Sequence, residues 1–202
     1  MISPLHLLAA FLWIASFSGA TKTTSTTARL PVAANETIAP ATREEDEEFI
    51  PWIPDRRLNW DDFLCEPKRN TDAVASTSTS LGIAYQLKNN KLTYQLTCNF
   101  SKVRSWGLVK TPYILAHEQA HFDITEIFAR RLHQALQNYK VNKTTFQQDI
   151  NRIYENVVNS KEAFQKLYDS QTDHSRHKGR QQDWLERIHE IMQETEPFAT
   201  YP

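Results

Sequence analysis

The sequence has few of the residues that mark several common classes of protein. Glycine occurs only four times and proline nine times in 202 residues, which excludes collagen-like and low-complexity structure. Neither sign of charge is in excess, because 23 basic and 24 acidic residues leave a formal net charge of -1. No basic stripe emerges, so the chain is not expected to bind nucleic acid. Its length suits one domain with tails.

Cysteine is also scarce, since Cys65 and Cys98 are the only two in the chain. They are too few and too far apart in sequence to form a cysteine-type zinc site. Two interpretations stay open for them. In an oxidising compartment they can form one disulfide, and otherwise they are two buried free thiols.

A long apolar run is found only at the N-terminus. Residues 1–20 are apolar and end in Ser18-Gly19-Ala20, which predicts a signal peptide cleaved before Thr21. The run is short of the roughly 20 residues that a membrane-spanning helix needs, although an uncleaved anchor is the alternative. We therefore expect a secreted or periplasmic protein with no stable membrane span after cleavage.

The rest of the chain divides into three parts. Residues 21–49 are rich in threonine and acidic residues and have no apolar period, which is typical of a flexible leader. A folded domain is expected over 50–195, and residues 196–202 form a tail.

Alternating apolar and polar residues on both sides of Asn89-Asn90 predict an antiparallel hairpin. The apolar positions are Leu81, Ile83, Tyr85, Leu87, Leu92, Tyr94, Leu96, Cys98 and Phe100. Before the hairpin, the stretch LNWDDF places Leu58, Trp60 and Phe63 as buried anchors.

Three helices are expected after the hairpin, which makes the domain α+β. They cover about 111–139, about 144–168 and a segment that includes 184–192, with a loop over 169–180. Thr111 is a suitable N-cap and Pro112 suits the first helical position. Thr145 and Gln148 match a capping box at the start of the second helix.

The strongest functional signal is HEQAH at 117–121. His117 and His121 lie one turn apart and about 40° apart around the helix axis, so both imidazoles can bind one metal ion. Glu118 is offset by one residue and can reach a metal-activated water, for which it is the general base. Apolar residues share the same side of the helix: Ile114, Leu115, Ile124 and Phe128. The histidines should therefore face inward, where polar groups need partners.

A catalytic zinc ion needs a third protein ligand and one open position. The first helix cannot supply this ligand, because Asp123, Glu126 and His133 lie about 140° to 160° away around its axis. The candidates elsewhere are His174, His177, His189, Glu155, Glu162, Asp169 and Asp173. The loop that carries His174 can fold back over the first helix, so His174 ranks first, and the others stay open.

Several motifs carry a resemblance to a known family. They are LNWDDF, Ser105-Trp106, HEQAHFDIT at 117–125, YDSQTDH at 168–174, Gln182 and Trp184. With them the chain resembles a bacterial family of predicted secreted zinc-dependent proteases, long described as a domain of unknown function. The resemblance covers roughly residues 58–192. It implies a zincin-like domain, with His117, His121 and His174 as zinc ligands and Glu118 as the catalytic residue.

We therefore predict a secreted zinc metallopeptidase, a hydrolase that binds one Zn²⁺ and cleaves peptide or protein substrates with Glu118 as general base. An exposed edge of the hairpin could pair with an extended substrate, or the hairpin could simply pack on the helices.

One alternative is a non-catalytic, metal-stabilised binding module that recruits Asp169 or Asp173. Another is a helical interaction domain without metal. Glu126 and Arg130 are expected to form an ordinary surface ion pair.

Overall fold

The computed structural model describes residues 48–68 and 71–202. The predicted signal peptide over 1–20 lies outside the described residues, and so does the predicted leader over 21–49 except for its last two residues. Within the described part of the chain, no helix combines the length and the apolar character that crossing a membrane requires.

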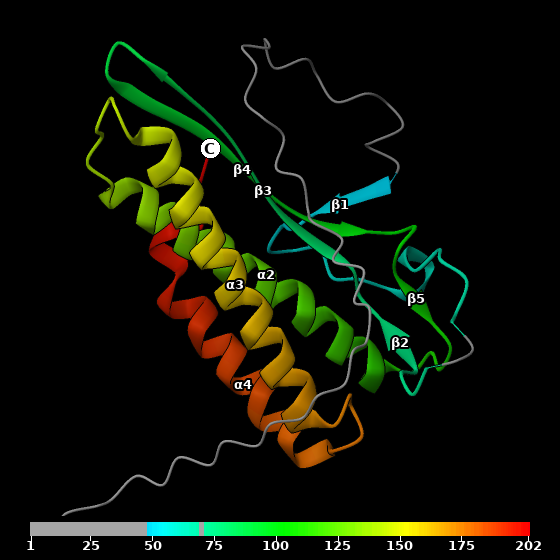
Figure 1. Cartoon of the computed structure of the whole chain (residues 1–202). Coiled ribbons are helices and arrows are strands. Elements are labelled where there is room, and N and C mark those ends of the chain that lie inside the picture. The colour runs from blue at the N-terminus through cyan, green and yellow to red at the C-terminus, as the bar shows by residue number, and fades with distance from the viewer. Residues whose placement is uncertain (1–47, 69–70) are drawn as a thin grey trace, which may run out of the picture. The chain divides into compact units, whose positions relative to one another are not determined.

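The fold is α+β, with antiparallel strands followed by three helices (Figure 1). The strands are β1 (Phe49–Pro51), β2 (Ala75–Ser76), β3 (Thr79–Lys88), β4 (Lys91–Ser101) and β5 (Trp106–Gly107). One sheet has the order β1-β4-β3, and β2 pairs with β5 in a second, two-stranded sheet. Strands β2 and β3 are therefore end strands of their sheets.

The predicted hairpin is confirmed as β3 and β4. Their register pairs Lys88 with Lys91 across a two-residue turn. Asn89 and Asn90 in this turn have φ values of 51° and 63°. Asparagine tolerates this left-handed conformation better than most residues, and such turns match the twist of the two strands.

The three predicted helices are present as α2 (Pro112–Asn138), α3 (Phe146–Thr172) and α4 (Lys178–Glu194). The hydroxyl of Thr111 accepts a hydrogen bond from the Ile114 amide at 3.2 Å and caps α2 as expected. The capping box predicted for α3 is wrong, because the Thr145 hydroxyl donates to Asp149 instead of capping the helix.

Helix α3 continues four residues past its predicted end at Tyr168. It ends at Thr172, and Asp173 follows in the left-handed conformation with a φ of 49°. Most of the loop expected over 169–180 is therefore helical, and only a short connection precedes α4. As a result Asp169 stands on a helix with a fixed direction.

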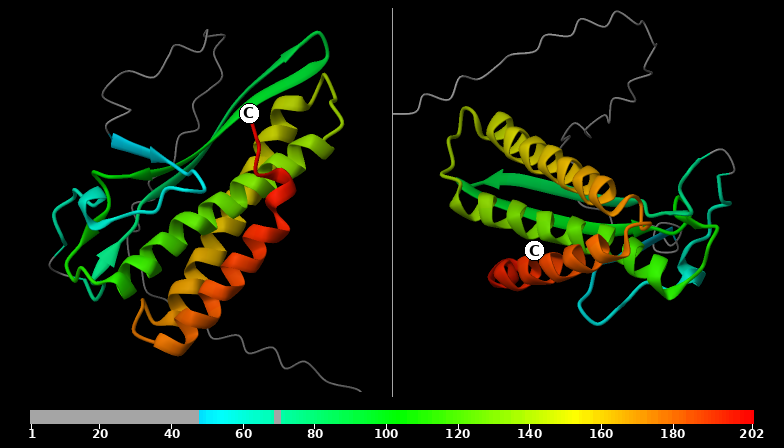
Figure 2. Two further views of the ribbon diagram at one scale, coloured as in Figure 1. Left: turned by 180° about the vertical axis from the view of Figure 1, so that it is seen from behind. Right: turned by 90° about the horizontal axis from the view of Figure 1, so that it is seen from below.

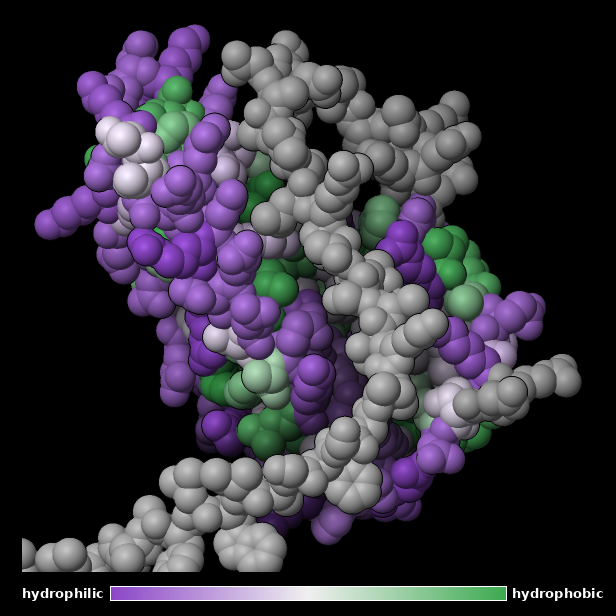
Figure 3. Space-filling view, viewed as in Figure 1, coloured by the Kyte–Doolittle hydropathy of each residue, from purple (hydrophilic) through white to green (hydrophobic). Residues whose placement is uncertain are grey.

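Helix α2 lies at the centre of the packing, against β3 and β4 on one side and against α3 and α4 elsewhere (Figure 2). The core includes Leu58 and Phe63 of the LNWDDF stretch, and Trp60 packs partly buried against it. Trp184 lies in the same core. The outward side chains of the helical layer are largely hydrophilic (Figure 3). Helix α3 accordingly buries only one narrow face, with Ile150, Lys161, Tyr168 and Thr172 as its buried residues.

Both cysteines are free thiols in the structure, so the possible Cys65–Cys98 disulfide is not formed. Cys98 is buried on β4, and burial raises the pKa of its thiol well above the usual value. Cys65 lies in the loop after η1 (Trp60–Asp62) and is only half-buried.

Candidate metal centre

Two histidines of α2 form the first half of the candidate site. His117 and His121 are four residues apart, and their ring centroids are 5.0 Å apart with nearly perpendicular planes. His117 is buried and only 12% of the His121 side chain is exposed. The expectation that this pair faces inward is confirmed.

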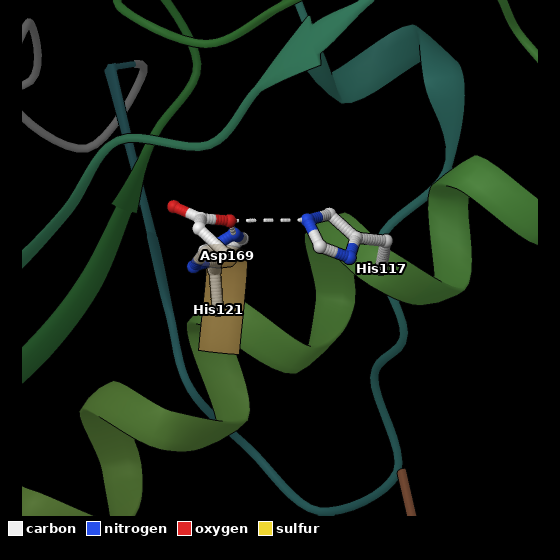
Figure 4. Close-up of side chains that lie close together, drawn as sticks. All are labelled: His117, His121 and Asp169. Carbon is white, nitrogen blue, oxygen red and sulfur yellow. Dashed lines mark hydrogen bonds and ion pairs between the residues drawn. The ribbon is translucent and has the colours of Figure 1, made fainter. Parts of the chain in front are cut away.

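Asp169 of α3 completes the cluster (Figure 4). Its Oδ1 atom lies 3.3 Å from Nε2 of His117 and 3.0 Å from Nε2 of His121. The three donor atoms all lie within 4.8 Å of one another. Two consecutive helices therefore present two nitrogens and one oxygen to a common point.

Neighbouring side chains fix the direction of both imidazoles. Tyr168 is fully buried and stacks on His117, with ring centroids 4.6 Å apart. Nδ1 of His121 is hydrogen-bonded to Oε1 of Gln165, and the Gln165 amide nitrogen donates to the His121 carbonyl at 3.1 Å. Because an amide oxygen only accepts, Nδ1 carries a proton, and Nε2 is the nitrogen that faces Asp169 and is available to a metal once it loses its own proton.

The charges of the cluster are coupled. Burial by itself raises the pKa of Asp169, but the hydrogen bonds from His117 and His121 outweigh it and hold this pKa well below its usual value. Burial lowers the pKa of His121, and the bond to Asp169 together with the charges of Asp169 and Glu118 raises it overall. The site therefore attracts positive charge.

The donor set fits a divalent transition metal. Around a tetrahedral ion with bonds of about 2.0 to 2.1 Å, neighbouring ligand atoms lie about 3.3 Å apart. The two separations of 3.0 and 3.3 Å to Oδ1 of Asp169 are close to this value. Imidazole ligands favour zinc and similar ions over magnesium or calcium. His117, His121 and Asp169 would hold such an ion.

A cleft of about 440 Å³ opens over the cluster. One wall is the segment 73–79, which contains β2 and the start of β3. The other walls are His117, Glu118 and His121 of α2 and the face of α3 from Lys161 to Asp169. The three candidate ligands thus lie between an end strand and two helices.

Unpartnered polar atoms gather at this cleft. Among the described residues, five buried side-chain atoms have no hydrogen-bond partner, and three of them belong to residues that line the cleft. These three are Nδ1 of His117, Oε2 of Glu118 and Oγ1 of Thr77. Buried polar groups normally have partners, so each of these atoms is available to a ligand or to water.

His174, which ranked first as third ligand, lies beside the cluster. Its Nδ1 atom is 3.7 Å from Oδ1 of Asp169, and 54% of its side chain is exposed. It follows the end of α3 in a turn where Asp173, His174 and Ser175 all have positive φ. Its role as a ligand stays a prediction.

The other candidate ligands differ in where they lie. His177 caps α4, where its Nδ1 accepts a hydrogen bond from the Arg180 amide at 3.3 Å. His189 is bonded to the Gln193 side chain at 2.9 Å on an exposed face of α4. Asp169 is one of several candidates in the sequence, and the absence of glycine and proline between Tyr168 and Thr172 is the local signal that the helix can continue through it.

Comparison with known families and proteins gives one match. The model of a family described as "Bacterial protein of unknown function (DUF922)" matches residues 55–177, which is more than half of the chain. The chain belongs to this family. The match contains the two histidines of α2, Glu118, Asp169 and His174.

No curated protein and no solved structure matched the chain. The description of the family assigns no activity.

Proposed function

We propose that the protein is a zinc-dependent metallopeptidase in which His117, His121 and Asp169 hold the metal and Glu118 is the general base. The observation that carries this proposal is the buried carboxylate of Glu118, with an unpartnered Oε2, next to a three-residue donor cluster on the wall of a cleft. A buried carboxylate without a partner is costly, which supports a chemical role.

The chemistry needs a Lewis acid and a base together. A zinc ion bound at this site would lower the pKa of water and polarise a substrate carbonyl. Glu118 would accept the proton of the attacking water and return it to the leaving amine. Asp169 would supply the negative charge of the metal site, and the two oriented imidazoles would supply its nitrogen ligands. Gln165 would hold His121 in the tautomer that binds metal.

The strand beside the cleft supports a peptide as the substrate. Strands β2 and β3 are end strands, and the segment 73–79 lines the cleft opposite the histidines. An extended peptide could add to such an edge through main-chain hydrogen bonds and present its carbonyl group to the metal cluster. We place this activity outside the cytoplasm on the basis of the predicted signal peptide alone.

The test combines metal content with cleavage. The purified chain lacking residues 1–20 is loaded with zinc and incubated with a complex peptide mixture, and the products are read by mass spectrometry. Glu118→Gln should keep one zinc per chain and lower cleavage by about 10²- to 10⁴-fold. Glu155→Gln, the same change on an exposed face of α3, should cleave as the wild type does. Undiminished cleavage by Glu118→Gln contradicts the assignment.

A second candidate is a metal-stabilised binding module without turnover. It is favoured by the position of His174, whose Nδ1 lies 3.7 Å from Oδ1 of Asp169 and could close the metal sphere as a fourth protein ligand. In that case His174→Ala should weaken zinc binding by about tenfold to a hundredfold or more. For the peptidase with an open position, His174→Ala and the control His189→Ala should bind zinc equally well.

A further inference from the structure

Lys161 is a buried lysine on the wall of the cleft. Only 6% of its surface is exposed, although lysine is almost never fully buried unless it is paired. It lies on the inward stripe of α3, one turn before Gln165 and two turns before Asp169. All three residues line the same cleft, so Lys161 places a positive charge at one end of the wall that holds the metal cluster.

The pairing of Lys161 is weak for so buried an ammonium group. Its Nζ lies 2.9 Å from Oε1 of Glu162, and 54% of the Glu162 side chain is exposed. Among the described residues, Glu162 is the only carboxylate within ion-pair distance of Lys161. An ammonium group has three donors, so this single, solvent-accessible partner leaves donor capacity toward the cleft.

We propose that Lys161 recognises a carboxylate of the substrate, which takes the place of Glu162 as its ion-pair partner. The inference rests on the proposed peptidase function and names its substrate class: peptides that carry negative charge near the cleaved bond. Lys161 and Asp169 are eight residues apart on α3, about 12 Å along the axis. An extended peptide covers this distance in about three to four residues.

Two sources can supply the carboxylate. One is an aspartate or glutamate side chain a few residues from the cleaved bond, and the other is the free C-terminus of the substrate. A buried lysine binds either through the same charge-assisted hydrogen bond. The experiment therefore uses peptides that carry only one of the two groups.

The test measures binding without turnover. Alanine-rich peptides with an uncharged fluorescent label and an amidated C-terminus carry one glutamate at successive positions. A peptide without glutamate carries a free C-terminus instead, and a neutral amidated peptide without glutamate is the reference. Their affinities for zinc-loaded Glu118→Gln protein are measured by fluorescence anisotropy, with and without Lys161→Met. We expect one charged peptide to bind about tenfold to a hundredfold more tightly than the neutral amidated peptide. Lys161→Met should remove this preference and leave binding of the neutral amidated peptide unchanged.

Controls separate recognition from folding. Lys143→Met removes the same charge from an exposed loop and should keep the preference. Glu162→Gln removes the competing carboxylate and should strengthen the preference, even if Lys161→Met does not fold. Equal loss of affinity for charged and neutral peptides in Lys161→Met, or an unchanged preference in Glu162→Gln, overturns the proposal.

The outcomes also distinguish the two proposals. If the wild type does not hydrolyse any peptide, the peptidase is refuted, and a Lys161-dependent preference for charged peptides still stands. If the wild type hydrolyses peptides but Lys161→Met leaves the charge preference of binding intact, only the role of Lys161 is refuted.

Discussion

Helix α2 carries two buried polar clusters that differ in how well their atoms are paired. Toward its C-terminal half, Glu126 and Arg130 are almost fully buried, and Nε of Arg130 donates to Oε1 of Glu126 at 2.8 Å. The second Glu126 oxygen accepts from the Tyr201 hydroxyl at 2.8 Å. Arg130 also donates to the Met192 carbonyl at 2.9 Å. This cluster ties α4 and the C-terminal tail to α2.

The other cluster, two turns earlier on the same helix, is buried but leaves two of its polar atoms unpaired. Nδ1 of His117 and Oε2 of Glu118 have no partner, and both residues line the cleft. Burial alone therefore does not distinguish a structural site from a functional one, whereas the pairing of its atoms does. A paired cluster should matter for stability, and an unpaired cluster should matter for binding and chemistry.

The largest effect on stability is expected at Glu126. Glu126→Gln leaves the buried charge of Arg130 without its partner and should lower the free energy of unfolding by about 3 to 5 kcal/mol. Glu118→Gln is the same chemical change in the unpaired cluster and should change it by less than about 1 kcal/mol, since no hydrogen bond is lost. Urea unfolding of the metal-free proteins measures both. Equal losses would show that the two clusters do not differ.

The next largest effect is expected on metal affinity. Asp169→Asn replaces the carboxylate that faces both histidines and should weaken zinc binding by at least about a hundredfold, or about 2.7 kcal/mol. Asp173→Asn, an exposed residue after the end of α3, serves as the matched control and should bind zinc as the wild type does. Competition with a chromogenic chelator gives both affinities. Wild-type affinity in Asp169→Asn would remove Asp169 from the metal sphere.

Zinc binding should also depend on pH. His121 must lose its proton to bind metal, and its pKa in the metal-free protein is raised. Protons therefore compete from a higher pH than they would at an ordinary histidine, and affinity should fall about tenfold per pH unit below the raised pKa. Chelator competition from acidic to neutral pH checks this, with His189→Gln as control. A flat profile would contradict a role for His121 as ligand.

Stability of the metal-free protein should show the opposite trend. The raised pKa of His121 stabilises the folded state. This contribution is fully present at pH values below about 6.5, the pKa of histidine in the unfolded chain, and is lost as the pH rises through the pKa of His121 in the folded protein. The lowered pKa of Asp169 also stabilises the folded state. This contribution is fully present above about pH 3.9, the pKa of aspartate in the unfolded chain, and is lost as the pH falls through the pKa of Asp169 in the folded protein. The pair should therefore stabilise the metal-free protein most between these two limits.

The smallest effect is expected at the C-terminal tail. Tyr201→Phe removes one hydrogen bond to Glu126 and should lower the free energy of unfolding by about 1 to 2 kcal/mol without changing zinc affinity. Thermal unfolding and the same chelator assay measure the two quantities. A loss of zinc affinity in Tyr201→Phe would mean that the paired and unpaired clusters are coupled through α2.

Local patterns predicted most of the fold. The alternation around Asn89-Asn90 predicted the β3–β4 hairpin, and Thr111 with Pro112 predicted the start of α2, because both signals depend on neighbouring residues only. The end of α3 was predicted too early. Its last residues, Gln171 and Thr172, carry no apolar period, and helix continuation there depends on the packing of α3 against α2.

Contacts between segments distant in sequence could not be predicted from such local patterns. The expectation that Glu126 and Arg130 form a surface pair is wrong, because their burial depends on the tail residue Tyr201 and on the end of α4. The i, i+4 spacing looks the same for a surface pair and a buried pair. Likewise, the spacing in HEQAH indicated the two histidines, but the direction of Asp169 depends on how α3 crosses α2.

The most direct test of the account is anomalous X-ray diffraction from zinc-loaded crystals at the zinc absorption edge. We predict one strong peak within about 2.0 to 2.2 Å of Nε2 of His117, Nε2 of His121 and one carboxylate oxygen of Asp169, with a remaining position not occupied by protein. A peak enclosed by four protein ligands would favour the binding module. A fully occupied zinc elsewhere, with none at these three residues, would contradict the account.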